Sequence, residues 1–326
     1  RVGGRAGPCV SANLICPGAT PRAAGLLGAT SQVPVHSAVR TPPPFGQLWG
    51  TPEDMGAAML DVQSTLDCLG DHDGTGVRVA IIDTGVEADH PWVGGKLVES
   101  YGVKLFEDGR ADIEPCKPLD VCGHGTAAAG QVRRVAPGVE FISIRVLSES
   151  REGSSEALVS ALQWVANQNV DIVNKSLSTL RLALALRIGH AVDDLYAKHV
   201  PCICAKGYQQ DGRDYPTSFG ASIGVTYDAL EPAELRYREN DMVEFVAHGV
   251  DSVVAWQNGG TRKVTGSSYA TPLVSGLAAR MLSARPGLSV FELKTLLKAY
   301  ADQYAQGWRQ SWMSEIEDRF STPSSR

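Results

Sequence analysis

Short, almost continuous apolar segments alternate with longer segments of helical spacing from residue 45 onward. VRVAIID (77–83) is nearly all apolar and β-branched, as expected of a strand buried on both faces of a parallel sheet. SSEALVSALQWVANQ (154–168) instead repeats its apolar residues at the spacing of one helix face. This alternation predicts an α/β fold in which helices flank a mostly parallel central sheet. The other expected strands span residues 141–147, 170–177, 200–205, 222–228, 242–247 and 251–256, and the other expected helices span 182–199, 270–284 and 289–305.

Local signals mark the ends of some of these helices. Ser154 or Ser155 is expected to be the N-cap of the helix over 154–168. Asn169, which follows that helix, suits a left-handed C-cap. Pro272 fits the first turn of the helix over 270–284, where the missing N–H of proline costs nothing.

The amino-terminal segment differs in composition from the rest of the 326-residue chain. Residues 1–44 contain four Arg, seven Pro and six Gly but neither Asp nor Glu, which predicts a linker or disordered segment. An organelle transit peptide shares this composition, but no amphipathic stripe lies between the prolines. Residues 45–310 are expected to form one domain and residues 311–326 a polar tail. The chain begins with Arg instead of Met, which leaves room for further domains upstream.

Charge and composition disfavour several classes of partner. The net charge is −6, so no basic surplus points to nucleic acid or an anionic membrane surface. No apolar run approaches the ~18 residues of a membrane-spanning helix. Seven cysteines without a CxxC pair argue against both a disulfide scaffold and a structural zinc site. No secretory signal is visible, so a reducing, cytoplasmic compartment is favoured, although the sequence does not fix it.

Three residues stand at positions that suit catalysis, and each has an ordinary interpretation as well. Asp83 ends the strand over 77–83, where a desolvated carboxylate either pairs with a group such as histidine or serves a turn. His124 lies between glycines in CGHGTAAAG (122–130), where a loop histidine bonded to backbone is the simpler interpretation. Ser268 stands at a helix start, where serine usually caps the helix but a nucleophile gains from the positive terminus. The order Asp, His, Ser makes the combination specific.

The segments around these residues, VAIIDTGVEADHP, GHGTAAAG and GSSYATPLVSG, resemble the three signature blocks of the subtilisin-like serine proteases. The resemblance covers roughly residues 48–305. It implies the family's three-layer α/β fold and hydrolysis of a polypeptide substrate through an acyl-enzyme. Ser268 would attack the scissile carbonyl, His124 would transfer its proton, and Asp83 would orient His124. The substrate-binding residues that the resemblance implies, partly as an added strand, are Ser176, Leu177, Ser178, Ala205 and Gly207.

The main departure from the family concerns its oxyanion-hole asparagine. The aligned segment reads Ala205-Lys206-Gly207-Tyr208, so Tyr208 stands where the amide donor is expected. Loss of one such donor typically costs about 10²–10³ in turnover, whereas the triad is worth on the order of 10⁶. The expectation is therefore a slowed protease suited to one processing step, with Gln209 or Gln210 as a substitute donor.

Two further departures concern metal binding and the substrate strand. Trp92 stands where many family members place an aspartate that binds structural calcium, and few carboxylates remain nearby. No cofactor and no metal ligand are therefore expected, although a structural calcium ion stays open. Lys175 replaces an apolar residue beside the expected substrate strand.

Two functions remain open at this point. One is a subtilisin-like endopeptidase, and the other is a catalytically weak or inactive protein that binds an extended peptide along residues 174–178. The presence of Tyr208 at the position of the oxyanion-hole asparagine motivates the second function. A lipase-type hydrolase is disfavoured because the chain has no G-x-S-x-G elbow, and a nucleotide-binding protein because it has no P-loop. The sequence does not define which bond is cleaved.

Overall fold

The computed structural model describes residues 60–106, 110–150, 153–207 and 213–321. The linker predicted over residues 1–44 and the expected oxyanion residues Tyr208 and Gln209 lie outside these ranges. The elements are, in chain order, α1 (Val62–Asp67), η2 (Leu69–Asp71), β1 (Arg78–Asp83), β2 (Leu97–Leu105), β3 (Ala111–Pro115), α2 (His124–Val135), β4 (Glu140–Arg145), α3 (Ser155–Val165), β5 (Ile172–Lys175), η3 (Leu182–Leu184), α4 (Ala185–Ala197), β6 (Cys202–Ala205), β7 (Ile223–Asp228), β8 (Leu235–Tyr237), β9 (Phe245–His248), β10 (Ser252–Trp256), β11 (Gly260–Val264), α5 (Ser267–Ala284), α6 (Val290–Ala305) and α7 (Ser311–Ser321).

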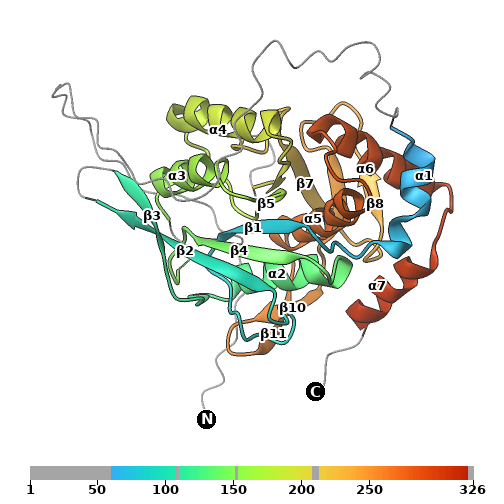
Figure 1. The fold of residues 1–326 in the computed structure, drawn as a ribbon, viewed down its shortest axis with the longest axis horizontal. Helices are drawn as coiled ribbons and strands as arrows, with labels where there is room; N and C mark the ends of the chain where they lie inside the picture. The colour runs from blue at the N-terminus through green and yellow to red at the C-terminus, as the bar shows by residue number, and fades with distance from the viewer. Residues whose placement is uncertain (1–59, 107–109, 151–152, 208–212, 322–326) are drawn as a thin grey trace.

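A nine-stranded sheet runs through the domain in the order β3-β2-β4-β1-β5-β6-β7-β9-β8 (Figure 1). The strands between β3 and β8 are all parallel, and these two pair antiparallel with β2 and β9. The predicted mostly parallel sheet is thus confirmed. β1 is an interior strand, the fourth in this order, and lies between β4 and β5. Its carboxyl end therefore opens at the point of the sheet edge where α/β proteins usually place their ligand sites.

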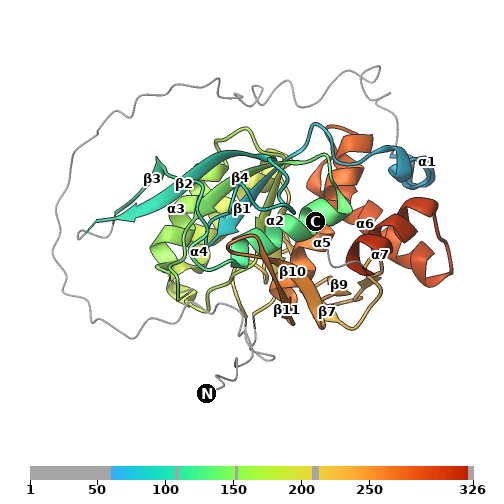
Figure 2. The same ribbon diagram turned by 90° about the horizontal axis from the view of Figure 1, so that it is seen from below.

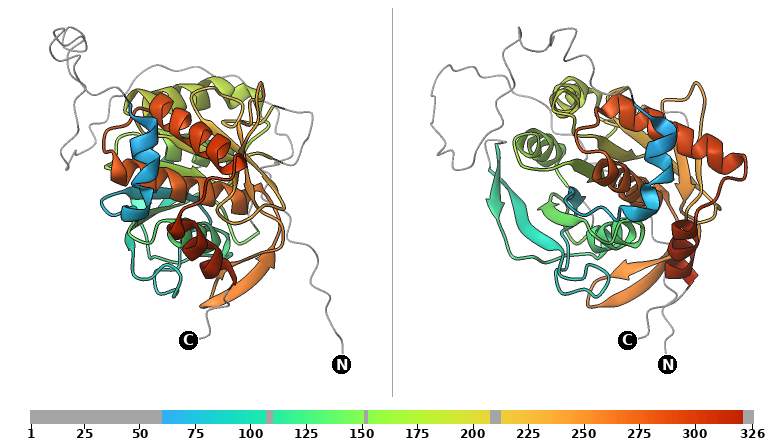
Figure 3. Two further views of the ribbon diagram at one scale, coloured as in Figure 1. Left: turned by 90° about the vertical axis from the view of Figure 1, so that its right-hand side faces the viewer. Right: turned by 45° about the vertical axis from the view of Figure 1, so that its right-hand side comes forward.

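Helices cover both faces of the sheet, which gives three layers (Figures 1 and 3). One core cluster joins Val79 and Ile81 of β1 to α2, α5, α6 and α7. The other joins Ala80 and Ile82 to α3 and α4. Successive strand residues point to opposite faces, so β1 is buried on both sides, and this explains its continuous apolar sequence. The β10–β11 hairpin lies beside α2 (Figure 2).

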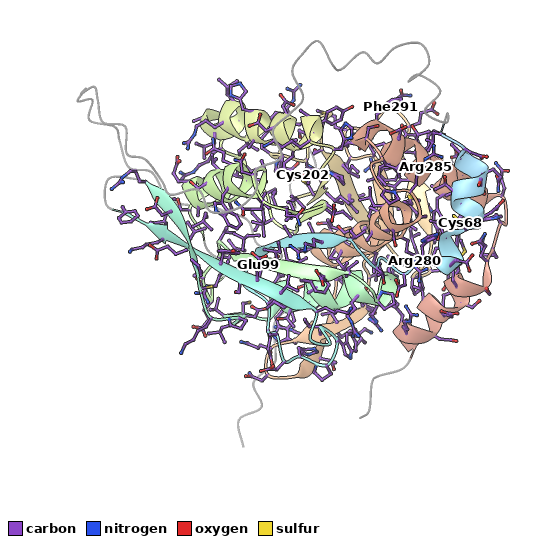
Figure 4. The ribbon with its side chains drawn as sticks, viewed as in Figure 1. Cys68, Glu99, Cys202, Arg280, Arg285 and Phe291 are labelled. Atoms are coloured by element: carbon purple, nitrogen blue, oxygen red, sulfur yellow. The ribbon has the colours of Figure 1, made fainter. Side chains whose placement is uncertain are left out.

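Arg280 holds several elements of one face together. This buried residue of α5 (Figure 4) donates to the carbonyl oxygens of Leu69, His72 and Val135 at 2.7–2.8 Å. Its guanidinium also lies over the ring of Trp312 in α7, 4.6 Å from the centroid. These contacts provide acceptors for a buried charge and join α5 to the segment before β1 and to the carboxyl end of α2.

Two expectations about helix ends are wrong. Residues 311–321 form α7 instead of a polar tail, because Trp312, Met313 and Ile316 supply a buried apolar face. Asn169 does not cap α3, which already ends at Val165 with Ala166 in a right-handed conformation. Lys198 of the α4 C-cap instead donates to the carbonyl of Ala166 at 2.7 Å, so no left-handed residue is needed there.

The N-cap of α3 is predicted correctly. The Ser154 hydroxyl accepts a hydrogen bond from the backbone N–H of Glu156 at 3.1 Å. None of the helices in the described part of the chain has the length and apolar character of a membrane span.

Candidate active site

The side chains of Asp83 and His124 meet at the carboxyl end of β1. Asp83 is the last residue of β1 and His124 the first of α2. Nδ1 of His124 lies 2.8 Å from Oδ1 and 2.9 Å from Oδ2 of Asp83, and both side chains are fully buried. A carboxylate only accepts, so Nδ1 carries the proton and Nε2 is left as an acceptor. Among the described residues, Nε2 is buried and has no hydrogen-bond partner.

Two glycines allow this close approach of α2 to β1. A Cβ on Gly125 would lie 2.0 Å from the carbonyl oxygen of Gly85 and 3.1 Å from Cβ of Asp83. Gly123 has a φ of 100°, and a Cβ there would meet the ring of Trp256 at 2.8 Å. The Gly-His-Gly sequence therefore reflects direct contact of the histidine turn with the end of β1 and with the β10–β11 hairpin.

Ser268 lies in the first turn of α5, where backbone N–H groups have no acceptor within the helix. The ring of its neighbour Tyr269 packs 5.4 Å from the ring of His124, so the turn lies against the histidine. The Ser268 hydroxyl donates to the carbonyl oxygen of Ser176 at 2.9 Å. The structure thus packs the turn that carries the buried Ser268 against the buried Asp83–His124 pair, with the serine hydroxyl directed to Ser176.

Pro272 lies inside α5 and not in its first turn, because the helix begins at Ser267, three residues earlier than expected. A proline has no N–H, so the carbonyl of Ser268, four residues earlier, lacks its helical donor. The hydroxyl of Ser176 donates to that carbonyl at 3.1 Å. Ser176 and Ser268 are therefore joined by two hydrogen bonds, one in each direction.

Sequence reasoning missed two residues that support this pair. Asn174 Nδ2 donates to the Ser176 hydroxyl at 3.2 Å, and the Ser275 hydroxyl donates to Asn174 Oδ1 at 2.9 Å. All of these side chains are buried. The one available signal was an amide that directly follows Ile172 and Val173 in an expected buried strand, since a buried amide needs partners on a neighbouring element.

The predicted substrate-binding residues fall on two neighbouring segments. Ser176, Leu177 and Ser178 follow β5, and Ala205 and Gly207 end or follow β6, which pairs parallel with β5. The two segments are thus adjacent along the same edge of the sheet.

Asp214 and Tyr215 connect these two segments, which sequence reasoning missed. Asp214 is 1% exposed, accepts from the Gly207 N–H at 2.6 Å and pairs with Lys206 Nζ at 2.8 Å. Tyr215 exchanges two backbone hydrogen bonds with Thr179, at 2.9 and 3.0 Å. The segment 214–215 therefore bridges the ends of β5 and β6.

No cluster of three His, Cys, Asp or Glu side chains suited to a metal ion occurs within the described ranges. Trp92 stands at the position where many family members have a calcium-binding aspartate. The guanidinium of Arg134 lies over its ring, 4.4 Å from the centroid.

Lys175 is an unusual buried cation next to the site. Its side chain is fully buried, and within the described residues its Nζ has no hydrogen-bond partner. It is paired in register with Ile82 and Cys204. Burial lowers the pKa of Lys175 from its ordinary value of 10.5, while the thiols of Cys204 and Cys202 act in the opposite direction. This lysine therefore costs folding free energy.

We expect the Lys175→Met variant to raise the free energy of unfolding by about 1–3 kcal/mol, because it removes an unsatisfied buried donor. Between the lowered folded pKa and 10.5, the unfolded state binds more protons, so wild-type stability rises with pH in that window. The advantage of the variant should thus be largest at low pH and shrink toward pH 10.5. Denaturant unfolding of wild type and variant at a series of pH values measures this difference in the free energy of unfolding.

Lys206→Met is the matched control for this prediction. Lys206 pairs with buried Asp214, so its removal leaves an uncompensated carboxylate and should destabilise the protein. Equal effects of the two substitutions would contradict the assignment of Lys175 as a costly residue.

Comparisons with known proteins identify the family of this chain. The model of the Subtilase family matches residues 74–311. Subtilisin DY from Bacillus licheniformis is 31% identical over 248 residues, which cover 70% of this chain and 84% of that protein. Alkaline serine exoprotease A from Vibrio alginolyticus is 31% identical over 239 residues, but the match spans only 42% of its length.

Solved structures show the same fold. A cold adapted subtilisin-like serine proteinase has a TM-score of 0.58 and 30% identity, with 70% of this chain and 83% of that chain covered. Sphericase has a TM-score of 0.58 at 25% identity and the same coverage. These matches confirm the three-layer α/β fold and the resemblance of the three sequence blocks: the chain belongs to the subtilase family of serine proteases.

Proposed function

We propose that this chain is a serine endopeptidase that hydrolyses peptide bonds through Asp83, His124, Ser268 and an acyl-enzyme. The observation that carries the proposal is the buried Asp83–His124 pair, which leaves Nε2 as a buried acceptor beside the first turn of α5. Membership of a serine protease family supports it. The triad roles themselves are carried over from the resemblance of the motifs.

Substrate binding has a direct consequence for the nucleophile in this proposal. An extended peptide added beside the segment after β5 needs backbone acceptors there, and the Ser176 carbonyl is one of them. In the resting site that carbonyl accepts from the Ser268 hydroxyl. A substrate N–H that takes its place turns the hydroxyl toward Nε2 of His124, the general base.

The reaction then follows from the positions of the groups. Ser268 Oγ attacks the scissile carbonyl carbon while His124 Nε2 takes its proton, and Asp83 stabilises the imidazolium. The imidazolium gives that proton to the leaving amine, and water hydrolyses the acyl-enzyme by the same route. The Ser268 N–H, in the first turn of α5, is the natural backbone donor to the oxyanion.

The second oxyanion donor distinguishes this chain from the usual family pattern. Tyr208 stands at the asparagine position, and we assign the amide role to Gln209. A substituted donor lowers turnover without removing the triad, which suits a protease that cuts one selected bond. Rapid, general degradation of casein would contradict this processing role.

Labelling with a fluorophosphonate tests the proposed function, since the reagent traps a serine that is activated by its base. At neutral pH we expect one adduct on Ser268, mapped by mass spectrometry, and none in the Ser268→Ala variant. Ser267→Ala is the matched control, because Ser267 lies in the same turn and donates to the carbonyl of Lys206. It should keep the adduct.

A folded wild-type protein that gives no adduct would overturn the proposal. The alternative, a peptide-binding protein without efficient cleavage, then predicts that an extended peptide binds equally well to wild type and to Ser268→Ala. The Ser268–Ser176 hydrogen bond is the observation that favours this alternative, since it directs the hydroxyl away from the base.

A further inference from the structure

Asp120 lies in the loop before α2. The residue is 3% exposed, and its carboxylate accepts five hydrogen bonds. Oδ1 accepts from the Thr84 hydroxyl at 2.7 Å and from the backbone N–H groups of Cys122 and Gly123 at 2.9 and 2.7 Å. Oδ2 accepts from the N–H and the hydroxyl of Thr126 at 2.7 and 2.6 Å. Every contact is with a donor, as an ionised carboxylate requires.

These hydrogen bonds connect both members of the buried acid–histidine pair. On one side is Thr84, whose N–H donates to Asp83 Oδ1 at 2.7 Å. On the other side are the residues around His124: Gly123 is bonded to Asp120 directly, and the Gly125 N–H donates to the Thr84 hydroxyl at 3.0 Å. Asp120 is thus connected to the end of β1 through Thr84 and to the turn that carries His124 through Gly123.

A helix cap alone does not explain this arrangement. Capping α2 requires only the N–H groups at its start, and Thr126 together with Gly123 supplies them. The bond from Thr84 adds a link across to β1, between segments 36 residues apart in the chain. This link fixes the end of β1 against the start of α2, the two places from which Asp83 and His124 project.

We propose that Asp120 is a positioning residue that holds Asp83 and His124 at their catalytic separation. This inference rests on the proposed function, because the separation matters for proton transfer. An amide at position 120 must turn its NH₂ group toward the donors on one side, either Thr126 or Thr84 with the loop N–H groups. Asp120→Asn therefore keeps the shape of the side chain but sets the NH₂ against at least one backbone N–H, which loses its acceptor, and reverses the hydrogen bond to one threonine hydroxyl.

The test compares Asp120→Asn with Asp171→Asn. Asp171 accepts from the Arg78 N–H at 2.8 Å and thereby holds the opposite, amino end of β1. We expect Asp120→Asn to lower kcat about 10- to 100-fold, the scale of a 1 Å misplacement, with KM nearly unchanged. Asp171→Asn should keep the wild-type kcat at matched folded fraction. Hydrolysis of a fluorogenic peptide and thermal unfolding give the two readouts.

A spectroscopic readout separates this inference from the proposed function. The His124 Nδ1 proton, held by a buried carboxylate, should give a strongly downfield proton NMR signal in wild type and in Asp171→Asn. The signal should be lost or shifted in Asp120→Asn. If the wild type fails to cleave peptides or to react with a fluorophosphonate, the proposed function fails, and this signal still decides the role of Asp120.

Thr84→Val and Thr84→Ser provide a second test that does not depend on how well Asp120→Asn folds. Valine matches the shape of threonine but removes the hydroxyl that links Asp120 to Gly125, whereas serine keeps it. Thr84→Val should slow turnover and shift the Nδ1 signal, and Thr84→Ser should restore both. A wild-type kcat and an unchanged signal in Asp120→Asn and Thr84→Val would overturn the inference.

Discussion

Ser268→Ala is expected to lower kcat by about 10⁶-fold, and adding His124→Ala in the same chain is expected to lower it no further. The alanine at position 268 removes the attacking oxygen, so the base at Nε2 has no proton to take. The two residues act as one unit, and removal of either one removes the reaction they share. Hydrolysis of a peptide ester by the single and double variants, measured over long incubations, checks this.

Ser275→Ala is the comparison variant for this experiment. Ser275 lies on the same helix but reaches the site only through Asn174, so its loss should be mild. If kcat of the double variant fell by the product of the two single losses, Ser268 and His124 would act independently. That result would contradict a shared proton transfer.

Asp83→Asn is expected to lower kcat by about 10⁴-fold while leaving the fold intact. The Thr84 N–H donates to Oδ1 at 2.7 Å and keeps the amide oxygen on that side. The amide NH₂ then takes the place of Oδ2, 2.9 Å from His124 Nδ1, while the amide oxygen stays 2.8 Å from Nδ1 as an uncharged and weaker acceptor. The NH₂ favours the tautomer with its proton on Nε2, which cannot accept the proton of Ser268, and the imidazolium loses the negative charge that stabilises it.

The measurement for Asp83→Asn is kcat with the same ester, together with the unfolding midpoint. A near-normal midpoint with lost turnover supports the tautomer argument, because a collapsed site would lower both. A turnover within tenfold of wild type would show that Asp83 does not set the protonation of His124.

The fold could be predicted from the sequence because its strands are buried on both faces. The continuous apolar run over residues 79–82 predicts β1, and the acid that follows this run is expected at the edge of the sheet. His124 was identified through the resemblance of GHGTAAAG to a block of the family, and the glycines of that block are required by contacts with Gly85 and Trp256. Where packing allows only one kind of residue, as at these glycines and in the apolar part of β1, a single sequence shows the pattern.

The supporting residues could not be predicted, for a physical reason. Asp120 and Asp214 are held largely by backbone N–H groups, and a sequence does not show which N–H groups converge on one point. The start of α5 was misplaced because serines read as a cap outside the helix, whereas Ser267 and Ser268 form its first turn. α7 was missed because its apolar residues are few among charged ones.

The position of Pro272 has a consequence for motion. Because proline frees the Ser268 carbonyl, the turn that carries the nucleophile is bonded to Ser176 as well as to its own helix. The attacking oxygen and the segment that would hold the substrate therefore travel together when α5 fluctuates. The bond from the Ser176 hydroxyl to the Ser268 carbonyl persists when a substrate N–H displaces the Ser268 hydroxyl, so the distance between nucleophile and substrate changes little when α5 moves.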